Sequence, residues 1–260
     1  MKNPFILAAL LCTLLTHITY SQHYWVGGTG NWSDASHWAT TSGGSTFHAN
    51  PPTKDDDVIF DQNSFTSGGQ TVTMDLNQGE CRSMTWANVV NNPGFNGASP
   101  DAINIYGDLT LSPDMTCNLR FIEMESPGTA QITTAGTSLG SNSILRCNGG
   151  GIYNLTDAVT TREIQVNQGT FNSNNNTINC EFAFRTSGNG PNTVNLGTST
   201  LNLRQWRLGG FNVTLNATNS TIYCQSFYAD ESATGPYSYG TVIINNGGGI
   251  YNGAIVENLT

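Results

Sequence analysis

The amino-acid sequence predicts an all-β protein that folds as a parallel β-helix (β-solenoid). Gly, Asn, Thr and Ser make up about 44% of the 260 residues, and charged residues only 10%. Thr, Val and Ile favour extended chain, whereas Gly and Asn favour turns and left-handed backbone. No apolar stripe with a period of 3.6 residues occurs after residue 22, so helices are not expected.

A repeated tetrad is the observation that selects a solenoid among all-β folds. Successive copies begin 23, 21 and 20 residues apart, a period typical of one coil with two or three short strands. The four copies are Thr177-Ile178-Asn179-Cys180, Thr200-Leu201-Asn202-Leu203, Thr221-Ile222-Tyr223-Cys224 and Thr241-Val242-Ile243-Ile244. An antiparallel sandwich would also have short strands, but it gives no reason for this repeat.

The tetrads also predict which side chains point inward. Because side chains alternate along a strand, the second and fourth members of each tetrad should form two buried columns. The first column is Ile178, Leu201, Ile222 and Val242, and the second is Cys180, Leu203, Cys224 and Ile244. A second repeat, Gly-Gly-Gly-Ile-Tyr-Asn at 149–154 and 247–252, indicates that the chain returns to the same local geometry.

Residues 1–21 are predicted to be a signal peptide. Lys2 precedes an apolar run at 5–15, and small residues stand at Thr19 and Ser21, before a cleavage site at Gln22. The run is too short to span a bilayer, and no longer run follows. We therefore expect an exported protein, secreted or at the cell surface, that is not an integral membrane protein and whose partners include the export machinery.

Residues 22–56 form a tryptophan-rich segment that we interpret as an N-terminal cap. Trp25, Trp32 and Trp38 lie within fourteen residues. Indole rings can stack on sugars, but the end of a solenoid exposes core that must be covered. We favour the second role, in which the tryptophans plug the first coil.

Residues 57–260 are assigned to the β-helix coils. Upstream of the tetrads, less regular strand candidates occur at 70–76, 82–89, 102–111, 119–125 and 130–134. The sequence stops at 256–260 inside strand-like residues, so we expect a chain truncated at the C-terminus.

Cysteine usage is consistent with a buried role. The predicted mature chain contains five cysteines, Cys81, Cys117, Cys147, Cys180 and Cys224, and none has zinc-type spacing. Cys180 and Cys224 fall in one column but two coils apart, so their Cα atoms should be about 9 to 10 Å apart at about 4.8 Å per coil. A disulfide requires about 7 Å or less, and we predict free thiols.

Few residues suggest chemistry. Asp55, Asp56, Asp57 and Asp61 have the oxygen ligands that Ca²⁺ prefers, but a solvated turn is the preferred interpretation. His37 with Asp34 could be an acid–base or metal pair, and we favour a packing histidine. The repeats contain too few ionisable residues to nominate a carboxylate pair for glycan cleavage. We expect no catalytic residue, cofactor or metal.

Charge excludes another class of partner. Nine Lys and Arg against eighteen Asp and Glu give a net charge of −9, which offers little to neutralise phosphates. Nucleic acid is not an expected partner.

Three segments resemble a known family. They are the run from Tyr24 to Trp38, the run from Asp55 to Asp61, and Ile105-Tyr106-Gly107-Asp108-Leu109-Thr110-Leu111-Ser112-Pro113. Together they are similar to the opening of large secreted β-helix repeat proteins of gliding-type Gram-negative bacteria, many exported by the type IX system. The resemblance implies a right-handed β-helix and an adhesin-like surface protein, with no catalytic residues. Such proteins usually end in a sorting domain, which is not visible here.

We therefore expect a non-enzymatic surface protein that is a stiff spacer or an adhesive surface contacting glycans. The alternative is a carbohydrate-active β-helix, a polysaccharide lyase or glycosidase, whose catalytic part lies beyond residue 260. A groove lined by two or more carboxylates would favour the enzyme, and a uniform Thr/Asn face the spacer.

Overall fold

The computed structural model describes residues 20–97, 101–188, 190–210, 212–228, 236–251 and 255–259. Almost all of the predicted signal peptide lies outside these residues. The described chain is strand and turn apart from one 3-10 turn, η1 (Ala35–His37). None of its helices is long and apolar enough to cross a membrane.

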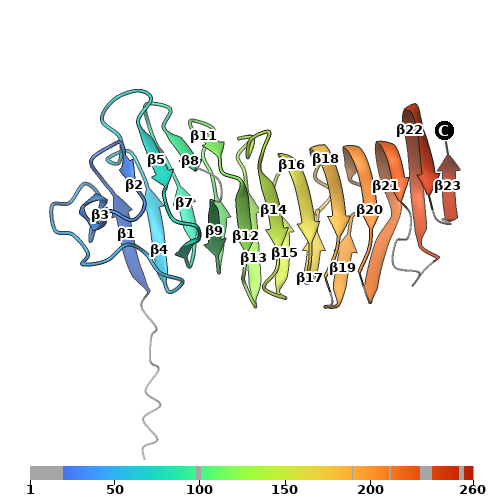
Figure 1. Ribbon diagram of the computed structural model, residues 1–260, viewed down its shortest axis with the longest axis horizontal. Coiled ribbons are helices and arrows are strands. Elements are labelled where there is room, and N and C mark those ends of the chain that lie inside the picture. Colours follow the sequence, from blue (N-terminus) through green and yellow to red (C-terminus); the bar gives the residue numbers. More distant parts are fainter. Residues whose placement is uncertain are drawn as a thin grey trace, which may run out of the picture.

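The strands stack side by side as coils of a parallel β-solenoid (Figure 1). In chain order, each coil visits three faces. Face A contains β1 (Ser21–Trp25), β4 (Asp56–Phe60), β7 (Met84–Trp86), β10 (Leu109–Thr110), β13 (Thr129–Thr133), β15 (Ile152–Leu155), β17 (Gly169–Asn172), β19 (Asn192–Asn195) and the start of β21 (Val213–Tyr228).

Face B begins with β2 (Gly30–Asn31), β5 (Thr71–Met74), β8 (Gly94–Gly97) and β11 (Thr116–Asn118). Face C contains β6 (Gly79–Cys81), β9 (Ala102–Ile105), β12 (Phe121–Met124), β14 (Ile144–Cys147), β16 (Val159–Val166), β18 (Ile178–Thr186), β20 (Thr200–Leu208), the later part of β21, β22 (Ser238–Tyr251) and β23 (Ile255–Leu259). In the later coils, the first halves of these long strands take the place of face B.

The tetrads stack in the predicted register. Ile178 is opposite Leu201, Leu201 is opposite Ile222, and Ile222 is opposite Val242. All four side chains are fully buried, which confirms the first inward column. In the second column Cys180 is opposite Leu203, and Cys224 is opposite Ile244. Among the described strands, the pair β1 and β3 (Trp38–Ala39) is antiparallel, and every other strand pair is parallel. This pattern excludes an antiparallel β-sandwich.

Parallel pairing starts earlier than residue 57. β1 lies parallel to β4, with His23 opposite Val58, so the segment interpreted as a cap contributes a strand to the stack. Each predicted upstream range contains or overlaps a strand, but β6, β8 and β11 lie outside all of them and β13 begins one residue early. The upstream coils also vary in length. Val58 and Met84 are neighbours on face A at 26 positions apart, whereas Tyr153 and Phe171 are neighbours at 18.

The two copies of the glycine hexapeptide lie at different places in the coil. The prediction that the chain returns there to the same local geometry is therefore wrong. Ile152 of the first copy pairs with Thr129 on face A, whereas Ile250 of the second pairs with Phe227 on face C. In the first copy the glycines permit close contact with the preceding coil. A Cβ on Gly149 would lie 2.1 Å from the backbone of Glu125, so glycine is required there for local packing.

The tryptophans of the first segment are core residues. Trp25, Trp32 and Trp38 have no exposed surface. Trp38 meets Trp25 and Trp32 edge to face, with centroids 5.0 and 4.9 Å apart, and its Nε1–H donates to the carbonyl oxygen of Trp32 (2.8 Å). The cluster continues through Phe60, whose ring stacks on Trp86 at 3.8 Å. The indoles therefore fill the first coils and offer no face to a sugar.

Asparagine has a specific role at the corners. Seven non-glycine residues among those described have positive φ, and six of them are asparagine: Asn88, Asn91, Asn92, Asn174, Asn175 and Asn212. Asparagine tolerates this backbone region better than other residues with a Cβ. The high asparagine content thus follows partly from the need to turn three corners per coil.

The five described cysteines are all buried and unbridged, which agrees with the sequence prediction for Cys180 and Cys224. Desolvation by burial raises the pKa of Cys117 and of Cys224 to about 12, and thiolate is the reactive form. We therefore expect the native protein to react with a thiol reagent much more slowly than the denatured protein. Thiol titration in both states, with peptide mapping, measures this. A peptide linking Cys180 to Cys224 would contradict the coil assignment.

Candidate functional site

The later coils bend at one position just after each tetrad. The pairing register shifts between Cys180 and Ala183, and again between Cys224 and Ser226, as at a β-bulge. The residue after the tetrad lies at this bend in each coil, and it is polar in all four: Glu181, Arg204, Gln225 and Asn245. The bend therefore has a column of polar side chains on neighbouring strands.

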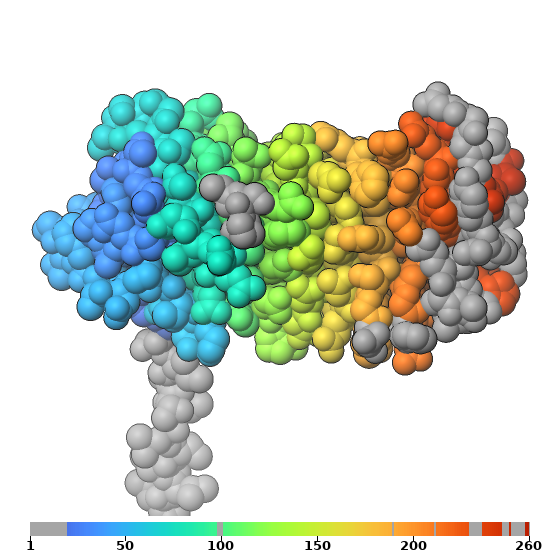
Figure 2. Space-filling model, in the orientation of Figure 1, coloured from blue at the N-terminus to red at the C-terminus, as the bar shows by residue number. Residues whose placement is uncertain are grey.

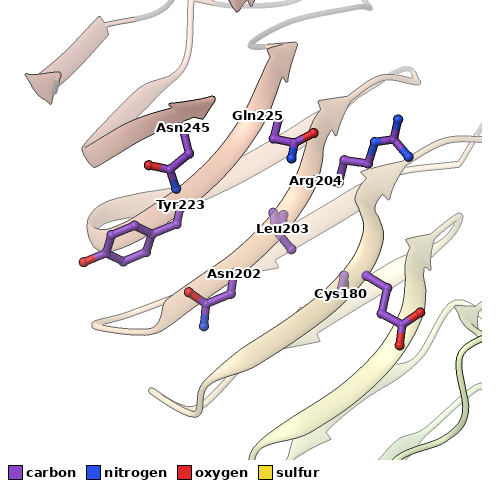
Figure 3. A pocket seen from close by; sticks show the side chains of 8 residues that line it. Cys180, Asn202, Leu203, Arg204, Tyr223, Gln225 and Asn245 are labelled. Atoms are coloured by element: carbon purple, nitrogen blue, oxygen red, sulfur yellow. The ribbon is translucent and has the colours of Figure 1, made fainter. Parts of the chain in front are cut away.

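This column lines a surface groove of about 390 Å³ across β18, β20, β21 and β22 (Figure 3). Asn202 and Tyr223, which are opposite each other in register, also line it, as do Cys180 and Leu203. Glu181 and Arg204 are exposed. Amides both donate and accept hydrogen bonds, and an aromatic ring offers an apolar face. These are the groups that contact sugar hydroxyls and sugar C–H faces.

Beyond the bend, face C has a connected row of charged side chains. Arg146 donates from Nη1 to Glu123 and from Nε to the side-chain oxygen of Gln165, both at 2.8 Å. Gln165 in turn donates to Glu163 (2.7 Å), and Arg185 lies 2.6 Å from the same carboxylate. The row spans β12, β14, β16 and β18. Each of its two carboxylates is therefore neutralised by an arginine.

Both carboxylates of this row are nearly inaccessible, with 7% of Glu123 and 2% of Glu163 exposed. Desolvation by burial raises the pKa of Glu123, against the opposing effect of Arg146. A buried carboxylate is stable only when it is paired and hydrogen-bonded. The row is thus a structural network with its arginines on the outside.

Arginine is concentrated on this side of the molecule. Five of the nine Lys and Arg residues lie in strands of face C: Arg146, Arg162, Arg185, Arg204 and Arg207. Arg120 lies directly before β12 of the same face. Composition gives only the low total of basic residues, so this local concentration could not be predicted from it.

Face A has a different and uncharged row. The side-chain amide of Asn172 donates to Asn154, and that of Asn195 donates to Asn172, each at 2.7 Å. Asn216 extends the row by one coil. Beside it lies a column of threonines, Thr170, Thr193 and Thr214. These later coils of face A are rich in Thr and Asn, but the exposed Ile152 lies in the threonine column, so the face is not the uniform one that the sequence associated with a spacer.

The four aspartates considered for Ca²⁺ have separate partners. Asp55 pairs with Lys54 at 3.0 Å in solvent, and Asp57 pairs with Arg82. Asp56 and Asp61 accept hydrogen bonds from the backbone N–H groups of nearby turn residues at 2.9 Å. Within the described residues, no group of three or more His, Cys, Asp or Glu is placed to hold a metal ion. That these aspartates bind no cation stays a prediction.

His37 and Asp34 also have separate roles. The His37 ring stacks on Trp25 at 4.6 Å, and its Nδ1 lies 2.6 Å from the carbonyl oxygen of Val26. Asp34 caps η1 by accepting the backbone N–H of Ser36 at 2.9 Å. His37 is thus a packing histidine, as the sequence favoured.

The grooves do not bring carboxylates together. Each of five surface grooves in the described part of the chain contains at most one carboxylate: Glu181, Asp56 or Asp101. Glycoside hydrolysis requires two that flank the bond.

The strand pairing and the groove define a parallel β-solenoid with a polar surface at its bend. Comparison of the chain with protein-family models, with curated proteins and with solved structures found no match.

Proposed function

We propose that the protein is a secreted, non-enzymatic surface protein whose solenoid is a stiff spacer and whose groove at the bend binds glycans. The observation that supports this best is the composition of the groove. It combines the ring of Tyr223 with the amides of Asn202, Gln225 and Asn245, and it contains a single carboxylate.

The solenoid suits weak, repeated contacts. Its coils follow one another along the long axis, as the successive colour bands of Figure 2 show, and their strands pair coil to coil. Similar polar groups therefore recur at about 4.8 Å. Many weak sites on one rigid body bind a polymer more tightly than any one of them does. The resemblance to adhesin-like β-helix proteins of gliding-type bacteria agrees with a cell-surface location and with export by a type IX system.

A binding assay with polysaccharides tests the proposal. We expect the protein to retain at least one immobilised polysaccharide and to leave its chain length unchanged on long incubation. Tyr223→Ala should weaken retention about tenfold, because it removes a ring face and a hydroxyl from the groove. Tyr24→Ala, at the far end of the solenoid on β1, is the matched control and should bind normally.

Two results would contradict the proposal. Release of new reducing ends or of unsaturated sugar products would show a carbohydrate-active enzyme. Equal retention of the Tyr223 and Tyr24 variants would show that the groove is not the binding site.

A further inference from the structure

We propose that the groove and the arginines of face C bind an acidic polysaccharide, whose sugars have carboxylate or sulfate groups. This inference rests on the proposed glycan binding and names the class of glycan. Its starting point is the distribution of charge. The chain has a net charge of −9, yet five of its nine basic residues lie in strands of face C.

Arg204 is the residue best placed to bind an anion. It is exposed at the bend and lines the groove on the strand next to Gln225 (Figure 3). No ion pair or hydrogen bond joins its side chain to another residue in the part of the chain that the structure describes. A guanidinium group has a planar set of donors that matches a carboxylate or a sulfate.

The arginines beyond the bend extend this site along the solenoid. Arg185 and Arg207 are opposite each other on β18 and β20, and Arg146 lies two coils from Arg185 in the same column, with Gln165 between them. The spacing from Arg146 to Arg185 is therefore about 10 Å, twice the strand separation. A linear polymer that runs across the strands would meet Arg146, Arg185 and Arg207 in turn, at spacings of about 10 and 5 Å.

The partial exposure of these side chains leaves donors available. The side chains of Arg146 and Arg185 are 27% and 36% exposed although each contacts a glutamate. The buried glutamates hold the arginines in place and offset part of their charge. The face therefore favours a ligand with dispersed anionic groups and many hydroxyls over the dense phosphates of a nucleic acid.

The test compares acidic and neutral polymers. Binding to alginate, chondroitin sulfate, dextran and single-stranded DNA is measured by affinity electrophoresis or calorimetry at low and at physiological salt. We expect binding to an acidic polysaccharide that weakens with salt, and much weaker binding to dextran.

Charge variants assign that binding to residues. Arg204→Ala should lower the affinity for the acidic polymer about tenfold, as expected for one charge-assisted contact, and Arg204→Lys should restore part of it. Lys54→Ala is the matched control. It removes the same charge from an exposed pair outside face C and should leave the affinity unchanged.

Distinct outcomes separate this inference from the proposed function. Equal binding of dextran and acidic polymers, lost in Tyr223→Ala but not in Arg204→Ala, would overturn the acidic ligand and retain glycan binding. Tighter binding of single-stranded DNA than of any polysaccharide would overturn the ligand class. No binding to any polymer would contradict both proposals.

Discussion

Ile222→Asp is expected to abolish the cooperative unfolding transition of the protein. The Ile222 side chain is fully buried between Leu201 and Val242 of the neighbouring coils. An unpaired carboxylate there costs several kcal/mol, which approaches the total stability of about 5 to 15 kcal/mol of an ordinary domain. Urea unfolding followed by circular dichroism measures the transition.

Two further variants keep this prediction testable if Ile222→Asp does not fold. Thr221→Asp introduces the same charge one residue earlier, at a half-exposed outward position, and should unfold much like the parent. Ile222→Val removes one methylene and should cost about 1 kcal/mol. Similar damage from Asp at both positions would show that the inward register is wrong.

The inward columns were predictable because they depend only on alternation. Within a tetrad the second and fourth residues face the same way, so Ile178 and Cys180 were both correctly assigned to the core. The same reasoning fails one residue later. At the bulge after Cys180 the alternation is interrupted, so neither the orientation of Glu181 nor the groove followed from periodicity. The signal was a polar residue after every tetrad.

The charged row of face C could not be predicted from the sequence, because the coils differ in length. Glu123, Arg146, Gln165 and Arg185 stack in one column, but their separations along the chain are 23, 19 and 20 residues. A fixed period near 21 misses these separations by two, two and one residues. A slip of one residue turns a side chain to the other face of a strand, and a slip of two pairs it with the wrong neighbour on the same face. Contacts between coils could not be assigned until the length of each coil was known.

Trp38→Ala is expected to lower the free energy of unfolding by about 3 to 5 kcal/mol, the usual cost of removing a large buried aromatic side chain. Its indole packs edge to face against Trp25, Trp32 and Phe60. The substitution leaves a cavity among these rings, and the carbonyl oxygen of Trp32 loses its donor. Urea unfolding followed by tryptophan fluorescence gives the free energy of unfolding.

The matched control for Trp38 is Phe47→Ala, since Phe47 belongs to the same segment but is 45% exposed. Its loss should change the free energy of unfolding by about 0.5 kcal/mol or less. Trp38→Phe should lie between the two, because it keeps a ring in the cluster but removes the indole N–H. Equal, small effects of Trp38→Ala and Phe47→Ala would show that the indole is not part of the core. A sugar-stacking role for the tryptophans would then have to be reconsidered, because only an accessible ring can meet a ligand.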